Sequence, residues 1–222
     1  MNDPFFALTG PQTIPAGATH LLVCLHGFGA DGNDLLSLAS PLQAAMAPQG
    51  ISLGVACPHA PQPTPFGQGR QWFRDLGWRF NDRDGLALVL PAFNAYIQGL
   101  QAAHGIAPAQ TVLLGFSQGA MTLLGLLPQL QPQPAGVVAL CGALTMPPSL
   151  SNPVKPPVLL VHGTEDDVLP ADASVQAAQW LEQQGYPTTL RLLPNLGHGI
   201  DAATLAELVV WLQELWATGQ PA

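Results

Sequence analysis

Short apolar runs alternate along the chain with longer segments whose apolar residues recur at helical spacing. The runs are five or six residues long and rich in Leu and Val, which is typical of strands buried on both faces. We predict strands at His20–Leu25, 51–56, Thr111–Phe116, 136–141, 158–162 and Thr188–Leu193. Helices are predicted between them at 33–46, 84–104, 118–130, 171–184 and 202–216. This alternation indicates an α/β fold with a mostly parallel central sheet and helices on both faces.

Three features do not fit this alternation. Pro91 falls inside the helical pattern of 84–104, where it would either kink the helix or mark its true start. Residues 58–82 form a long Pro- and Gly-rich loop whose aromatic content favours packing over disorder, and 143–157 form a shorter Pro-rich loop. A chain of 222 residues predicts one domain, 1–222, without a large cap domain, so only these two loops are available to cover a site.

Composition narrows the class of protein. Apolar residues make up 48% of the chain, yet no apolar run approaches 18 residues, and no basic flank precedes an apolar segment at the N-terminus. We therefore expect neither stable membrane insertion nor a secretory signal. A net charge of −8 with a single lysine argues against nucleic-acid binding. Cys24, Cys57 and Cys141 lie in apolar runs and are expected to be buried free thiols, which favours a cytoplasmic location.

The strongest chemical motif follows the third predicted strand. Residues 115–119 read GFSQG, between an apolar strand and an apolar helix, which is the setting of a nucleophile elbow. In such an elbow the turn is tight, the flanking glycines relieve crowding, and Ser117 is exposed as a nucleophile. The alternative is a plain tight turn with a structural serine.

A serine nucleophile needs a base and an acid that orients the base. Only His162 and His198 follow Ser117; His198 lies in a loop before the last helix and is the predicted base. His162 ends a strand and is expected to make local hydrogen bonds. The acid should come from the cluster 165–167, and a metal site built from His162 and these acids is not expected, because a second histidine at ligand spacing is missing.

The tetrahedral intermediate requires two backbone N–H donors. The predicted donors are the amides of Gln118, which follows the nucleophile, and of Phe28, which lies in the glycine-rich turn His26-Gly27-Phe28-Gly29. The alternative for that turn is a strand-to-helix connection without a ligand.

Together these residues resemble the phospholipase/carboxylesterase family of α/β-hydrolases, which includes acyl-protein thioesterases and bacterial carboxylesterases. The resemblance covers nearly the whole chain and rests on LHGFGADGND (25–34), PHAP (58–61), WFRD (72–75), GFSQGA (115–120), HGTEDDVLP (162–170) and GHG (197–199). It implies Ser117 as nucleophile, His198 as base, Asp166 as acid, and Trp72 on the wall of the substrate groove. The sequence departs from the family at 62–71, which leaves the chain-length preference open, and at Ala120, where relatives commonly have glycine.

We therefore expect a serine carboxylesterase that hydrolyses short- to medium-chain acyl esters through an acyl-enzyme intermediate and needs no cofactor or metal. Its partner would be a small-molecule ester bound in a groove lined by Phe28, Phe66, Trp72 and Leu169. Thioesterase or lysophospholipase activity at the same site stays open, as do a serine peptidase, an acyltransferase and a non-catalytic binding module. The resemblance alone suggests a homodimer.

Overall fold

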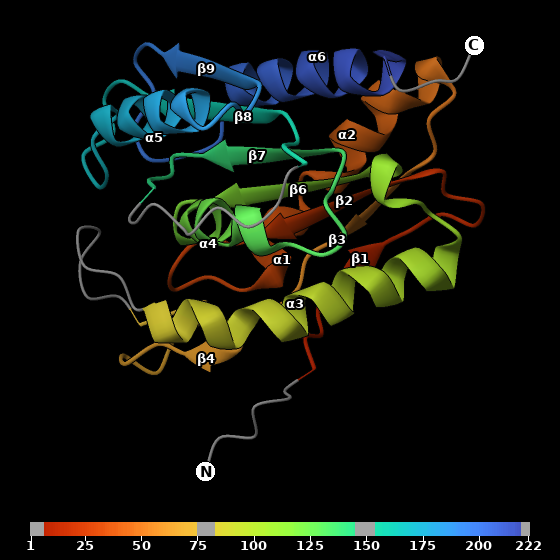
Figure 1. Ribbon diagram of the computed structural model, residues 1–222, viewed down its shortest axis with the longest axis horizontal. Coiled ribbons are helices and arrows are strands. Elements are labelled where there is room, and N and C mark those ends of the chain that lie inside the picture. The colour runs from red at the N-terminus through yellow and green to blue at the C-terminus, as the bar shows by residue number, and fades with distance from the viewer. Residues whose placement is uncertain (1–6, 75–82, 145–153, 219–222) are drawn as a thin grey trace.

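The computed structural model describes residues 7–74, 83–144 and 154–218, which form a twisted sheet between two layers of helices (Figure 1). The strands of this sheet, in the order β1-β3-β2-β6-β7-β8-β9, are β1 (Gln12–Thr13), β3 (Leu53–Ala56), β2 (His20–Leu25), β6 (Thr111–Phe116), β7 (Gly136–Leu140), β8 (Val158–Gly163) and β9 (Thr188–Leu193). Only β1 is antiparallel to its neighbour; the other pairs are parallel. A separate hairpin joins β4 (Gln62–Pro63) to β5 (Arg70–Gln71).

Helices cover both faces of the sheet. Successive side chains of a strand point to opposite sides, so each buried strand presents apolar side chains to both layers of helices. Leu21, Val23 and Leu25 pack on one side against α3 (Arg83–His104), α4 (Gln118–Leu126) and α5 (Asp172–Gln183). Leu22 and Cys24 pack on the other side against the remaining α-helices, which are α1 (Gly32–Leu36), α2 (Ala39–Met46) and α6 (Ala202–Thr218). The predicted α/β class is confirmed.

Short 3₁₀ helices and small breaks account for most boundary differences. The predicted helix 33–46 is two helices, because Pro41 has no N–H with which to bond the carbonyl of Ser37. The predicted helix 118–130 ends as a 3₁₀ turn at Leu127–Gln129, and other such turns lie at Ala47–Gln49 and Pro108–Gln110. The edge strand β1 and the β4–β5 hairpin were not predicted.

Pro91 neither begins nor ends α3, which runs through it. The carbonyl that Pro91 leaves without a helical partner belongs to Ala87, and both residues are exposed, so water can bond that carbonyl. Among the described residues, the stretch Gly85–His104 is long and apolar enough to cross a membrane by length and composition. It is weak evidence for a span, because a core helix passes the same test and Phe93 and Ile97 pack into the core.

The order of the strands along the sheet reverses direction at β2. The chain passes from β2 to β3 on one side, and then to β6 on the other side of β2. Parallel sheets bind ligands at such a switch point, outside the carboxyl ends of the strands. The loops after β2 and β6 therefore emerge side by side, and these loops carry the predicted Phe28 and Ser117. Cys24, Cys57 and Cys141 are buried and free, as expected.

Candidate active site

Ser117 occupies a strained turn between β6 and α4. Its φ of 53° and ψ of −117° lie in a region that L-residues rarely adopt. The flanking glycines are required by close backbone contacts: a Cβ on Gly115 would lie 2.4 Å from the carbonyl carbon of Gly119, and one on Gly119 would lie 2.1 Å from the oxygen of Leu25. The turn thus has the geometry expected of a nucleophile elbow.

The structure brings the three predicted catalytic side chains together in a chain of hydrogen bonds. Ser117 Oγ lies 3.0 Å from His198 Nε2, and His198 Nδ1 lies 2.6 Å from Asp166 Oδ2. These residues come from three separate loops, which follow β6, β8 and β9. The ring of Phe116 packs at a tilt against the His198 ring, with 5.0 Å between the centroids.

Asp166 turns inward while its acidic neighbours face water. Its carboxylate has no exposed surface, whereas Glu165 and Asp167 are exposed. Oδ1 accepts the backbone N–H groups of Val168 (2.9 Å) and Leu169 (2.8 Å). Burial alone would raise the pKa of Asp166, but these N–H groups and the His198 ring lower the pKa below its usual value. Asp166 is therefore an ionised acceptor in the buried site.

A close backbone approach positions the predicted acid and the predicted base. A Cβ on Gly163 would lie 2.1 Å from the carbonyl oxygen of Leu196, so only glycine fits between β8 and the loop that carries His198. Glu165 N–H donates to the same Leu196 oxygen at 2.9 Å, which joins the two loops. The glycine of the HGTEDD segment thus has a steric role that its sequence position alone did not reveal.

The turn after β2 lies beside the serine. A Cβ on Gly27 would stand 3.4 Å from Cβ of Ser117, and the N–H of Gly29 donates to the carbonyl of Arg70 in the β4–β5 hairpin at 3.0 Å. The hairpin therefore braces the turn that contains Phe28. Gly29 has a φ of 82°, a conformation that glycine adopts without strain.

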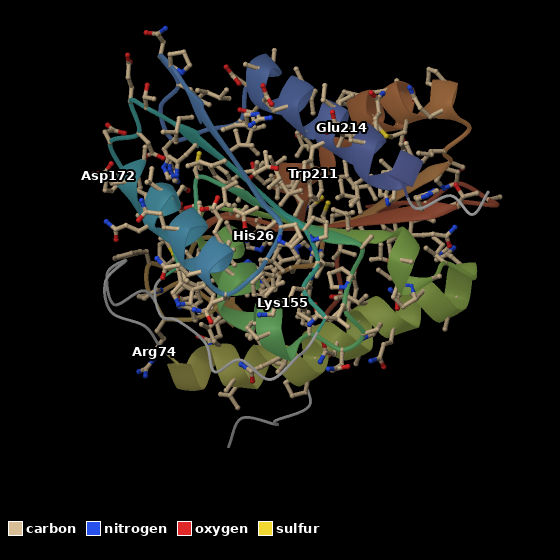
Figure 2. All side chains as sticks on the ribbon, turned by 45° about the horizontal axis from the view of Figure 1, so that its top comes forward. His26, Arg74, Lys155, Asp172, Trp211 and Glu214 are labelled. Atoms are coloured by element: carbon tan, nitrogen blue, oxygen red, sulfur yellow. The ribbon has the colours of Figure 1, made fainter. Side chains whose placement is uncertain are left out.

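A buried histidine orients this turn from the interior of the molecule, where Figure 2 shows it. The N–H of Ala60 donates to His26 Nε2 at 3.0 Å, so the hydrogen of the neutral ring is on Nδ1, which donates to the carbonyl of Gly27 at 2.8 Å. The Gly27 carbonyl and the Phe28 N–H belong to one planar peptide and point in opposite directions. His26 therefore fixes the direction of the predicted Phe28 donor.

The predicted groove residues differ in their exposure. Phe66, in the loop between β4 and β5, is 81% exposed. Trp72 has no exposed surface; its ring N–H donates to the carbonyl of His26 at 2.9 Å, and its backbone N–H donates to the Gln118 side chain at 2.9 Å. Leu169 is only 2% exposed, and its side chain belongs to the core next to α5.

The prediction that Trp72 and Leu169 line the groove is therefore corrected. A side chain without exposed surface cannot touch a substrate unless it moves. Trp72 supports the turn after β2 through the bond from its ring N–H to the His26 carbonyl, and Leu169 supports Asp166 through its backbone N–H. Of the aromatic residues in the predicted 58–82 loop, Trp78 and Phe80 lie outside the described residues.

The side chains of Cys141, Asp166 and His198 are close enough together to be tested as a metal site, with one donor atom of each within 4.8 Å of the others. The 2.6 Å separation of His198 Nδ1 and Asp166 Oδ2 is that of a hydrogen bond. Burial, with the nearby Asp166 charge, raises the pKa of Cys141 to about 11, which disfavours the thiolate that a metal would need. The donor set therefore fits a hydrogen-bonded pair better than a metal centre.

Comparison with known proteins agrees with this geometry. The sequence profile of the Phospholipase/Carboxylesterase family matches residues 14–215. The chain is 29% identical to the Acyl-protein thioesterase 1 of Gibberella zeae, covering 92% of this chain and 94% of the relative. It is 28% identical to the Esterase YpfH of Escherichia coli, covering 90% and 84%. The crystal structure of esterase PE8 superposes with a TM-score of 0.81 at 33% identity, covering 95% of this chain and all of the other.

Proposed function

The chain belongs to the phospholipase/carboxylesterase family of serine hydrolases, and on that premise we propose that it hydrolyses short- to medium-chain acyl esters through an acyl-enzyme intermediate on Ser117. The observation that carries the proposal is the chain of two hydrogen bonds from Ser117 Oγ through the His198 ring to the buried Asp166 carboxylate. When the His198 ring is neutral with its hydrogen on Nδ1, Nε2 can accept the proton of Ser117 Oγ while the Asp166 carboxylate accepts the Nδ1–H.

In the acylation step, Ser117 Oγ attacks the ester carbonyl carbon while His198 Nε2 accepts the hydroxyl proton. Asp166 holds the Nδ1–H of His198, so that Nε2 is the free acceptor, and it stabilises the imidazolium that forms. Collapse of the tetrahedral intermediate breaks the bond to the leaving alcohol, which takes the proton from His198. Water then repeats the sequence at the acyl-serine and releases the acid.

The developing oxyanion is assigned to the backbone N–H groups of Phe28 and Gln118. Gln118 is the first residue of α4, where the helix dipole also favours negative charge. The strained φ of Ser117 and the His26 bond to Gly27 orient these two amides before substrate binds. Such preorganised donors supply much of the rate enhancement in acyl transfer.

A thioester substrate is the second candidate, because the relative from Gibberella zeae, which matches over most of both chains, is named an acyl-protein thioesterase. The same attack serves both substrates, since only the leaving group changes from alcohol to thiol. Lysophospholipids are a third ester class for this site. We further propose a cytoplasmic enzyme, in line with its free cysteines, and a homodimer by family resemblance.

Labelling with a fluorophosphonate probe tests the proposal directly. The wild-type protein should lose activity in step with modification of Ser117, identified by peptide mass spectrometry, and Ser117→Ala should neither label nor turn over. Activity should fall as the pH is lowered, because a protonated His198 cannot accept the serine proton. Normal turnover by Ser117→Ala would overturn the mechanism.

A substrate series then defines the specificity. The kcat/KM values for p-nitrophenyl esters from acetate to palmitate should be highest at short to medium chain lengths, and matched oxygen and sulfur esters should separate esterase from thioesterase preference. A clear preference for palmitate would contradict the short-acyl proposal. A large preference for the sulfur ester would favour the second candidate.

A further inference from the structure

The Asp166 carboxylate contacts a second imidazole that the proposed mechanism does not use. Asp166 Oδ2 lies 2.6 Å from His198 Nδ1 and also 3.0 Å from His162 Nε2. The side chains of His162 and Asp166 have no exposed surface. His162 lies in β8 and His198 in the loop after β9, so the two rings reach this oxygen from different segments.

The neighbours of His162 Nε2 show that this nitrogen carries a hydrogen. The carbonyl oxygen of Leu169 lies 2.9 Å from Nε2, and a carbonyl can only accept. The second neighbour, the Asp166 carboxylate, is an acceptor as well when ionised. The Nε2–H of His162 is therefore shared between these two oxygens, and Asp166 receives it as a fourth hydrogen bond beside those from Val168, Leu169 and His198.

The opposite side of the ring does not change this conclusion. His162 Nδ1 lies 2.7 Å from Ser174 Oγ on α5, and that oxygen lies 3.0 Å from the carbonyl of Gly142. When the Ser174 hydrogen points to Nδ1, the His162 ring is neutral; when it points to Gly142, Nδ1–H donates and the ring is cationic. Both arrangements use the same heavy-atom positions, and both keep the hydrogen on Nε2.

We infer that His162 is a positioning residue, whose Nε2–H holds the Asp166 carboxylate in the orientation that receives the Nδ1–H of His198. This inference rests on the proposed function of Ser117, His198 and Asp166. With Oδ1 held by the backbone of the following turn, the His162 bond fixes the carboxylate about its remaining rotation. The bond also takes up part of the negative charge of Oδ2, which limits how strongly Asp166 stabilises a protonated His198.

The ionisable groups around this network lie in the segments that follow three strands. Asp166 follows β8, His198 follows β9, and Cys141 follows β7. The Cys141 thiol is held neutral, since burial and the nearby Asp166 raise its pKa to about 11. From α5, the group that faces His162 is the uncharged Ser174 hydroxyl. A change at His162 should therefore act on activity through Asp166 and His198.

Two substitutions separate the donor from the rest of the ring. The amide of His162→Asn ends near the position of Nδ1, so it keeps the Ser174 contact but does not reach Asp166. The amide of His162→Gln reaches the position of Nε2 and offers two hydrogens, one for Asp166 and one for Leu169. His104→Asn, at an exposed position near the end of α3, is the matched control.

We expect His162→Asn to lower kcat about tenfold, as for loss of a hydrogen bond to a charged group, with KM within about threefold of wild type. The acid limb of its kcat/KM profile should move to higher pH by roughly half a unit, because a less satisfied Asp166 holds the proton on His198 more strongly. His162→Gln should restore both properties, and His104→Asn should match wild type. A merely structural role would lower Tm without moving the profile.

Direct detection of the proton keeps the inference testable if His162→Asn does not fold. In the wild-type protein labelled with ¹⁵N-histidine, NMR should find His162 Nε2 protonated at pH 8; a bare Nε2 would overturn the inference. So would a folded His162→Asn with an unchanged pH profile and kcat. If Ser117→Ala stays active, the proposed function fails; if Ser117→Ala is inactive and His162→Asn is unaltered, only the role of His162 fails.

Discussion

Replacing Asp166 by asparagine tests the site most sharply. The amide has the same shape as the carboxylate, but its NH₂ group adds hydrogens at a place toward which four N–H donors already point. Oδ1 accepts from Val168 and Leu169, and Oδ2 accepts from His162 and His198. In the better orientation the amide oxygen keeps the two backbone N–H groups, and the NH₂ then faces both imidazoles. His162 cannot move its proton without losing the carbonyl of Leu169.

His198 must therefore change its tautomer. Its Nδ1 becomes an acceptor for the new amide, and the hydrogen moves to Nε2, which faces Ser117 Oγ. A protonated Nε2 cannot accept the serine proton, so we expect kcat to fall by roughly 10⁴, about 5.5 kcal/mol of transition-state stabilisation. KM should change little, and the free energy of unfolding should fall by only about 1–3 kcal/mol for the disturbed buried hydrogen bonds.

The assay is p-nitrophenyl butyrate hydrolysis, normalised by active-site titration, with Tm measured in parallel. Glu165→Gln and Asp167→Asn are the controls, since both residues are exposed and each change removes one neighbouring charge. Both should keep activity within about twofold of wild type. A folded Asp166→Asn variant that loses less than tenfold in kcat would refute the argument, as would an inactive Asp167→Asn.

Three further perturbations follow from the structure. Gly119→Ala should lower Tm strongly and abolish activity, because its Cβ would lie 2.1 Å from the Leu25 oxygen. By contrast, a Cβ at Gly99, an exposed position of α3, meets nothing within 4 Å, and Gly99→Ala should stabilise by about 0.5–1 kcal/mol. Equal Tm changes would contradict the steric argument. Burial lowers the pKa of His26, so protons favour the unfolded chain; Tm should hold above about pH 6.5 and fall below it, less steeply in His26→Asn. Equal slopes would exclude His26 as the cause. Phe66→Ala should leave Tm unchanged, since the side chain is 81% exposed, but should lower kcat/KM more for octanoate than for acetate esters if Phe66 contacts the acyl chain.

The main elements and the serine turn could be predicted because their signals are local. A buried parallel strand must be apolar throughout, and the elbow needs glycines beside its serine, so both leave short patterns in the sequence. The position of Asp166 within its acidic cluster came from family resemblance rather than from spacing. The structure adds the physical reason: the Asp166 side chain accepts the N–H groups of Val168 and Leu169, whereas Glu165 and Asp167 are exposed to water.

The missed features depend on residues far apart in the chain. β1 is two residues long and is a strand only because it pairs with β3. Trp72 was predicted to line the groove, yet its side chain is buried and its ring N–H donates to the carbonyl of His26. Such contacts leave no local pattern, since the sequence does not show whether a side chain contacts solvent or a backbone group far away in the chain.

The sequence by itself determined the fold class, the strained serine turn and the set of groups available for acyl transfer, because strand burial and turn geometry are encoded by neighbouring residues. Only the tertiary structure decided how these groups share protons. The loops after β8 and β9 meet across Gly163, and this meeting puts two imidazoles on one carboxylate oxygen. His162 could be recognised as the end of a strand, but its bond to Asp166 exists only because a turn brings that carboxylate back over its ring.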